Sequence, residues 1–179
     1  ECNVLEIMGK INKNITQFGY PSSIKEVKTI GRTFLFKIEG PLYINTEISM
    51  CTLRIEISQR EAILLKPEIK AITPIYPDLQ PYVIVVMQQK ELLAEKVRAI
   101  MTRNKPRDIF DLHFLLKKKV PFDINFINKK LKYYGKSYNK EKFMKSLKAK
   151  QSIWEKELKN YMTTVPSFDI IYREIRKSV

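Results

Sequence analysis

The chain has 179 residues, which fits one domain or one small domain with a helical appendage. Its formal net charge of +14 favours a polyanionic partner or substrate: nucleic acid, a nucleotide or an acidic protein. Two cysteines exclude a disulfide-framed secreted scaffold, and a single histidine excludes a Cys/His zinc site. Because no apolar run is long enough to cross a bilayer and residues 1–20 do not read as a signal peptide, we expect a cytoplasmic protein in a reducing setting.

The first half of the chain is expected to mix helix and strand. Apolar residues at helical spacing predict an amphipathic helix that Gly19 and Pro21 end. Strict alternation of apolar and polar residues further along predicts strands. In chain order, the expected elements are a helix over 3–18, strands over 34–38 and 51–58, a proline-rich segment over 63–81 that cannot be regular throughout, and a short buried strand over 82–87.

The second half is expected to be helical. Pro106 fits the first turn of a helix, and Asp108 follows early in it, where a carboxylate suits the helix dipole. The expected helices cover residues 89–103, 106–118, 123–134, 139–162 and 167–177. The predicted fold class is therefore α+β, with an α/β part over 1–87 that is followed by a helical part over 88–179.

Two single residues have alternative interpretations. His113 lies in an apolar run, which favours a packing histidine over a catalytic one, because no nucleophile stands at a recognisable spacing from it. Glu56 lies on the polar face of the strand 51–58, where it could hold a divalent metal or could be a solvent-facing glutamate that pairs with Arg54.

A denser charged cluster surrounds the connection between the first two expected helices. Lys96 and Arg103 are seven residues apart and share one helix face, and Asp108 and Asp111 share a face of the next helix. With Lys105 and Arg107 beside the connection, the cluster could orient a phosphate. It could equally be a salt-bridged corner that Asp108 caps.

Most of the excess charge lies in residues 117–150, which hold 12 lysines against Asp123 and Glu141. Aromatic residues alternate with these lysines. Basic and aromatic side chains together suit a nucleic-acid backbone and its exposed bases. The alternative is a helical surface with aromatics in the core and lysines in solvent.

The run QKELLAEKVRAIMTRNKPRDIFDLHFLL, residues 89–116, resembles the AbiEii family of nucleotidyltransferase-like toxins. The strand sequence LRIEISQRE, residues 53–61, is also similar to a central strand of that family. The resemblance spans about residues 1–135. The positions of the helical run that match are Glu91, Ala94, Glu95, Lys96, Arg103, Arg107, Asp108, Asp111 and Leu112.

The resemblance implies a DNA polymerase β-like nucleotidyltransferase core, a mixed sheet with helices, followed by a helical bundle. It implies a toxin of a toxin–antitoxin or phage-defence pair that uses Mg²⁺ and transfers a nucleotide from a nucleoside triphosphate to RNA, such as tRNA, or to a protein. Glu56 then matches a metal-binding carboxylate. The other implied site residues are Lys96 and Asp108 for catalysis and Lys96, Arg103, Arg107 and Asp111 for nucleotide binding. The resemblance implies a cognate antitoxin as a protein partner. It does not imply binding to a membrane.

The chain departs from the family pattern at its beginning. The family has a Gly-Gly or Gly-Ser turn, followed by an Asp-x-Asp pair that supplies most of the metal ligands. Neither motif occurs in this chain. One explanation is a missing N-terminal segment, which the start without Met favours, so that the α/β part is incomplete and the chain alone is inactive. The other is a member that has lost catalysis. A rival interpretation is a non-catalytic basic protein that binds nucleic acid or an acidic partner.

Overall fold

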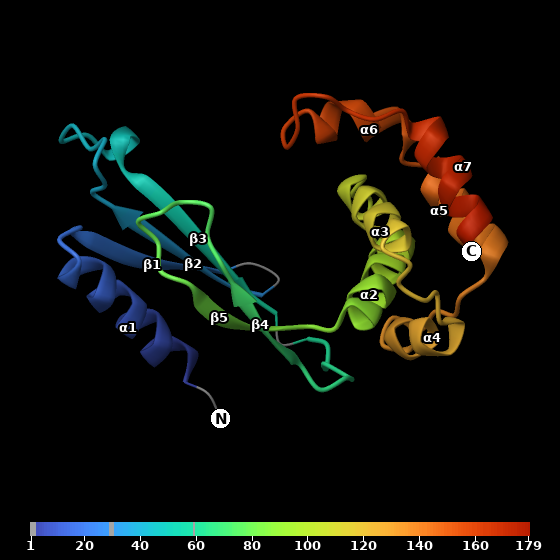
Figure 1. Cartoon of the computed structure of the whole chain (residues 1–179), viewed down its shortest axis with the longest axis horizontal. Helices are drawn as coiled ribbons and strands as arrows, with labels where there is room; N and C mark the ends of the chain where they lie inside the picture. The colour runs from blue at the N-terminus through green and yellow to red at the C-terminus, as the bar shows by residue number, and fades with distance from the viewer. Residues whose placement is uncertain (1–2, 29–30, 59) are drawn as a thin grey trace. The chain divides into compact units, whose positions relative to one another are not determined.

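The computed structural model describes residues 3–28, 31–58 and 60–179 of the chain (Figure 1). These residues fall into two compact units, residues 1–62 and 63–179, which we describe separately. They form seven α-helices and two antiparallel sheets, so the predicted α+β class is confirmed. None of the helices that the structure describes is both long and apolar enough to span a bilayer.

The first unit packs one helix against a three-stranded antiparallel sheet with the strand order β1-β2-β3 (Figure 1). Phe34 and Phe36 point from the middle strand to the helix and are buried with Val4 and Met8. This arrangement confirms the helix expected over 3–18 and both expected strands. The elements are α1 (Val4–Gln17), β1 (Ser22–Lys28), β2 (Arg32–Ile38), the 3₁₀ turn η1 (Glu47–Ser49) and β3 (Cys51–Ile57).

Gly31 stands at the start of β2 because the neighbouring strand approaches it closely. A Cβ atom at this position would lie 2.8 Å from the carbonyl oxygen of Ile57, closer than such atoms come in proteins. Only glycine leaves enough room there. The first residue of β2 can then pair with the end of β3, where Arg32 faces Ile57 in the register.

The second unit consists of a two-stranded hairpin and six helices (Figure 1). Its core holds the apolar stripes of α2 and α3, including Leu93, Val97, Ile109 and Leu112, and the inner faces of the later helices. The elements are β4 (Glu68–Ile72), β5 (Tyr82–Val86), α2 (Gln89–Thr102), α3 (Arg107–Lys117), α4 (Ile124–Lys132), α5 (Lys140–Lys148), α6 (Gln151–Leu158) and α7 (Phe168–Ser178).

Two expectations for this unit were wrong in part. The strand expected to be buried over 82–87 is β5, and its side chains are exposed, with Val85 72% accessible. Its hydrogen-bonded neighbour among the described residues is β4, so no second layer covers it. The strand β4 itself fits between Pro67 and Pro74, inside the segment expected to be interrupted by prolines.

The helix expected over 139–162 is two helices, α5 and α6, with a break at Ala149 and Lys150. At the break the N–H of Lys150 bonds to the carbonyl of Leu147, three residues back, which tightens the last turn. The Lys150 side chain turns inward and is buried, and its Nζ donates to the carbonyls of Ile100 at 2.8 Å and Ser146 at 3.0 Å. The periodicity of the sequence continues through this break and therefore does not reveal it.

A buried charge network fastens α4 to α2. The Glu91 carboxylate is fully buried and lies 2.5 Å from Lys130 Nζ, which also lies 2.9 Å from Glu95. Glu91 further accepts the backbone N–H groups of Leu64 and Leu65, both at 2.8 Å. Burial alone would raise the pKa of Glu91, but these bonds outweigh it and lower the pKa.

Candidate functional site

The predicted charged cluster forms one site at the connection between α2 and α3. We call it the charged corner and define it as Lys96, Arg103, Asp108 and Asp111. Lys96 lies on α2, Arg103 follows the end of α2, and the two aspartates lie on α3. The backbone N–H of Asp108 bonds to the Lys105 carbonyl, which closes the first turn of α3 and turns its carboxylate toward α2.

Asp108 is the centre of the charged corner. Its side chain is completely buried. Arg103 binds it with two parallel bonds, Nε to Oδ2 and Nη2 to Oδ1, both 2.8 Å long. This forked arrangement is the strong geometry for an arginine and a carboxylate. Lys96 Nζ approaches Oδ1 at 3.4 Å, so both basic groups are oriented by one carboxylate.

The electrostatics of the corner keep Asp108 ionised. Burial favours the neutral acid, but the hydrogen bonds from Arg103 and the charge of Lys96 outweigh it and lower the pKa of Asp108. In the reverse direction, the hydrogen bond to Asp108 raises the pKa of Arg103. Asp108 and Arg103 therefore form an ion pair at the centre of the corner.

The basic groups of the corner remain accessible. The Lys96 side chain is 22% exposed and the Arg103 side chain 47% exposed. Lys96 Nζ also lies 2.6 Å from Asp111, whose side chain is 42% exposed. An anion from solvent can thus reach both cations, and Asp111 is the group with which it would compete for Lys96.

Arg107 turns away from these four residues toward the connection that follows α6. Its Nη1 donates to the Tyr161 hydroxyl at 2.6 Å, and its guanidinium lies 5.6 Å from the centre of the Tyr161 ring. Lys105 is exposed, and no carboxylate among the described residues pairs with it. The structure thus gathers Lys96, Arg103, Asp108 and Asp111, and it places Arg107 on a different partner.

Glu56 lies on β3 in the first unit, whereas Lys96 lies on α2 in the second. The Glu56 side chain is 64% exposed, and Arg54 Nη2 lies 2.5 Å from its carboxylate. The same residues line a depression of about 370 Å³ that also includes Gly31, Arg32 and Arg60. Among the residues described, no three His, Cys, Asp or Glu side chains gather to hold a metal ion.

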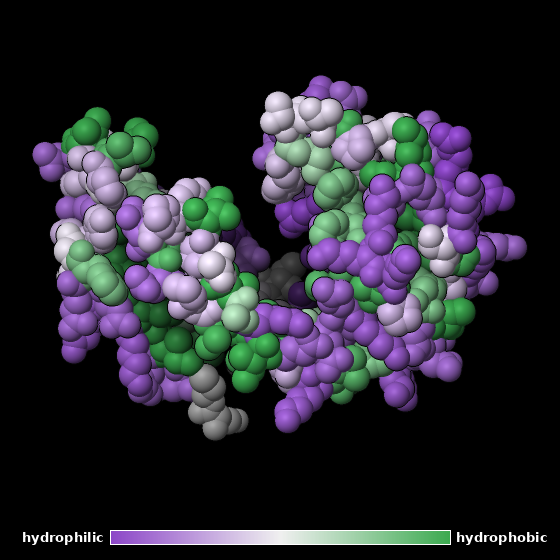
Figure 2. Space-filling model, in the orientation of Figure 1, coloured by the Kyte–Doolittle hydropathy of each residue, from purple (hydrophilic) through white to green (hydrophobic). Residues whose placement is uncertain are grey.

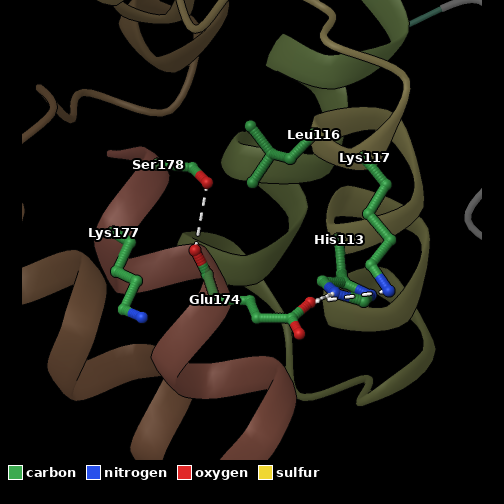
Figure 3. Close-up of a pocket in the computed structure, with 6 residues that line it drawn as sticks. All are labelled: His113, Leu116, Lys117, Glu174, Lys177 and Ser178. Atoms are coloured by element: carbon green, nitrogen blue, oxygen red, sulfur yellow. Dashed lines mark hydrogen bonds and ion pairs between the residues drawn. The ribbon is translucent and has the colours of Figure 1, made fainter.

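His113 is buried on α3 and lies 2.5 Å from the carboxylate of Glu174 on α7 (Figure 3). Lys117 lies 3.6 Å from the same carboxylate. The bond from His113 lowers the pKa of Glu174. No serine or cysteine is bonded to His113 among the described residues, so the site resembles a helix-to-helix contact and supports the interpretation of a packing histidine.

Sequence reasoning did not identify the partners of these residues. Glu174 lies 61 residues from His113, and Tyr161 lies 54 residues from Arg107. Glu91 and Glu95 belong to the matched family run, yet in the structure they serve the buried contact with Lys130. The spacing of four residues predicts that Glu91 and Glu95 lie on one helix face. It does not identify the lysine that binds them.

The comparisons with known proteins agree with the matched runs. A sequence model of the nucleotidyl transferase AbiEii toxin, a type IV toxin–antitoxin system, matches residues 3–174. Searches of curated proteins and of solved structures gave no match. The matched range includes α1, the sheet with Glu56 and the whole charged corner. This chain therefore belongs to the AbiEii family of nucleotidyl transferase toxins.

Proposed function

We propose that this protein transfers a nucleotide from a nucleoside triphosphate to an RNA, such as tRNA, or to a protein target, as a toxin in a toxin–antitoxin or phage-defence system. The observation that carries the proposal is the charged corner, which lies inside the family match and presents two oriented, accessible cations. Cations that are fixed before a phosphate arrives bind it with little reorganisation.

In this proposal Lys96 and Arg103 contact the phosphates of the nucleotide. Asp108 is fully buried and its oxygens already accept bonds from Arg103 and Lys96, so it acts as a positioning residue behind them. Asp111 is the exchangeable partner: when phosphate oxygens bind Lys96, Asp111 gives up its bond and turns to solvent. Arg107 is held by Tyr161 and would contribute at longer range.

The family also implies Mg²⁺, and the described residues do not form a complete site for it. Glu56 supplies one carboxylate, which is exposed and engaged by Arg54. One carboxylate supplies too few oxygen ligands for the two-metal site of nucleotide transfer. Glu56 stays a predicted metal ligand, and the roles proposed for Lys96 and Arg103 concern their own contacts with the phosphates.

The target would be held by the lysines of 117–150, and a cognate antitoxin is the expected protein partner. Hydrophilic side chains cover much of the face of the helical unit that Figure 2 shows. The charge of this unit suits a polyanion. A cytoplasmic setting stays a prediction from the sequence.

The first test is a titration of the protein with ATP. Lys96→Met, which keeps the apolar stem, should weaken ATP binding at least about tenfold, because a phosphate loses a charge-assisted bond. The control is Lys10→Met on α1, where an exposed lysine pairs with Glu6. If ATP binds the wild type and both variants equally, or does not bind at all, the corner is no nucleotide site and the rival, a non-catalytic binding protein, is favoured.

The positioning role of Asp108 has its own test. Asp108→Asn keeps the shape and removes the charge, so Arg103 loses its forked partner. We expect ATP affinity to fall while the affinity for RNA stays unchanged. A merely structural role would lower both affinities together. Transfer of label from ATP to total tRNA then reports on catalysis separately from binding.

A further inference from the structure

A second basic pocket lies in the helical unit, beside the end of α2. It has a volume of about 330 Å³ and is lined by Met101, Gly135, Lys136, Ser137, Lys142 and Ser146. These residues come from the end of α2, the turn between α4 and α5, and α5 itself. Unlike the depressions around His113 and Glu56, this pocket has no carboxylate among its lining residues.

The polar groups around the pocket are mainly hydrogen-bond donors. Lys136 Nζ donates to the carbonyl of Met101 at 2.8 Å, which neutralises the negative end of α2 and leaves two of its three protons unused. Within the part of the chain that the structure describes, the Lys142 ammonium and the Ser137 hydroxyl have no partner. A pocket with two ammonium groups and a free hydroxyl selects an anion.

The surroundings indicate which anion. Lys132 precedes the turn and Lys145 lies one helical turn after Lys142, and neither has a carboxylate partner among the described residues. Tyr133, two residues before Gly135, is 63% exposed. An exposed ring beside a row of cations is what single-stranded nucleic acid requires, since bases stack on the ring while phosphates meet the cations.

We propose that this pocket binds a phosphodiester group of an RNA strand, with Lys142, Lys136 and Ser137 as its donors. This assignment adds a binding site for the target to the proposed function. The choice of RNA as the ligand rests on that proposed function. The assignment divides the two kinds of phosphate between two sites: the nucleotide at the charged corner and the RNA backbone at the α4–α5 turn.

The test measures binding of a fluorescein-labelled oligouridylate to the full chain by anisotropy. Lys142→Gln should weaken binding at least about tenfold and reduce the slope of log affinity against log salt by about 0.7, the value for one lost contact to a single strand. The matched control is Lys156→Gln, an exposed lysine on α6 that does not line the pocket and lies outside residues 117–150, with an expected change below about twofold. Lys136 is unsuitable for this comparison, because its loss would also uncap α2.

Three outcomes overturn the assignment. Equal losses in Lys142→Gln and Lys156→Gln would mean diffuse attraction without a pocket, and no loss in either would mean no binding there. Release of the oligouridylate by ATP at a concentration that saturates the charged corner would mean that the pocket takes nucleotide phosphates. If ATP does not bind the corner while the Lys142 effect persists, the proposed function fails and the RNA site stands.

Discussion

The two units of this protein stabilise themselves in different ways. In the first unit the buried core of the described residues consists of Val4, Met8, Phe34 and Phe36. In the second unit eighteen apolar residues of the described part are buried together. Since apolar burial is the main favourable term in folding, the second unit can bury charged groups at a cost that the first could not bear.

The ion pairs follow the same division. In the first unit Glu6–Lys10 and Arg54–Glu56 lie on the surface, with more than half of each side chain exposed. In the second unit Glu91, Lys130 and Asp108 are buried, although Arg103, the partner of Asp108, is 47% exposed. The forked pair Arg32–Glu26 of the first unit is partly exposed, so fully buried charges are what distinguish the helical unit, where the candidate nucleotide and RNA sites lie.

The largest expected effect is that of Glu91→Gln. The change removes the charge that faces the buried Lys130 and leaves one of two backbone N–H groups without an acceptor. We expect a loss of about 3–5 kcal/mol in the free energy of unfolding. Trp154, the single tryptophan and buried in this unit, reports the urea transition by fluorescence. The control Glu6→Gln breaks an exposed pair in the first unit and should cost about 0.3–0.5 kcal/mol, measured by hydrogen exchange in α1 because Trp154 lies in the other unit. Equal losses would erase the distinction between the units.

Acid should unfold the helical unit for the same reason. The pKa values of Glu91, Glu95 and Asp108 are lowered in the folded protein, so their contribution to stability is complete above the ordinary values of 4.5 and 3.8 and is lost as the pH falls through the lowered values. A Trp154 fluorescence titration should show this loss. In Glu91→Gln the dependence on pH should be shallower, and an unchanged profile would assign the acid transition to other groups.

A smaller effect is expected for Gly31→Ala in the first unit. The new Cβ would meet the Ile57 carbonyl oxygen at 2.8 Å, so β2 and β3 would have to separate at this end. We expect a loss of about 1–3 kcal/mol. Hydrogen exchange should speed up at the amides of β2 and β3 and stay unchanged in the core of the helical unit. Faster exchange in both units would mean that they unfold together.

The smallest effect, and one of opposite sign, is expected for Gly9→Ala. Gly9 lies inside α1, and nothing stands within 4 Å of the position that its Cβ would take. Alanine in a helix interior is favoured over glycine by about 0.5–1 kcal/mol. The thermal stability of the first unit should therefore rise. A fall would show that the surface of α1 is in closer contact than the structure describes.

The sequence predicted the elements whose apolar pattern is long or strict. The stripes of α1, α2 and α3 and the alternation of β3 all appear where they were expected. The strand β1 was not predicted, because Ser22–Lys28 is mostly polar and pairs on one edge only. The strand β5 was wrongly expected to be buried, because an apolar run alone does not reveal whether a second layer covers it.

The charged corner could be predicted in its membership but not in its geometry. Spacing within α2 and within α3 placed Lys96 with Arg103 and Asp108 with Asp111 on common faces. Which basic group binds which aspartate depends on how the two helices pack. Spacing along the sequence does not predict that packing. The role of Arg107 differs for this reason, since Tyr161 arrives from 54 residues away to hold it.

The group formed by Glu91, Glu95 and Lys130 also limits how this protein can change over time. Replacing Glu91 or Lys130 leaves an uncompensated charge inside the helical unit, whereas replacing the whole group together with Arg98, which binds Glu95, by well-packed apolar residues can be neutral or even stabilising. Such a route passes through unstable single variants, so mutation one step at a time tends to preserve the group. Its persistence in descendants would then reflect the barrier between sequences as much as any advantage of the ion pairs themselves.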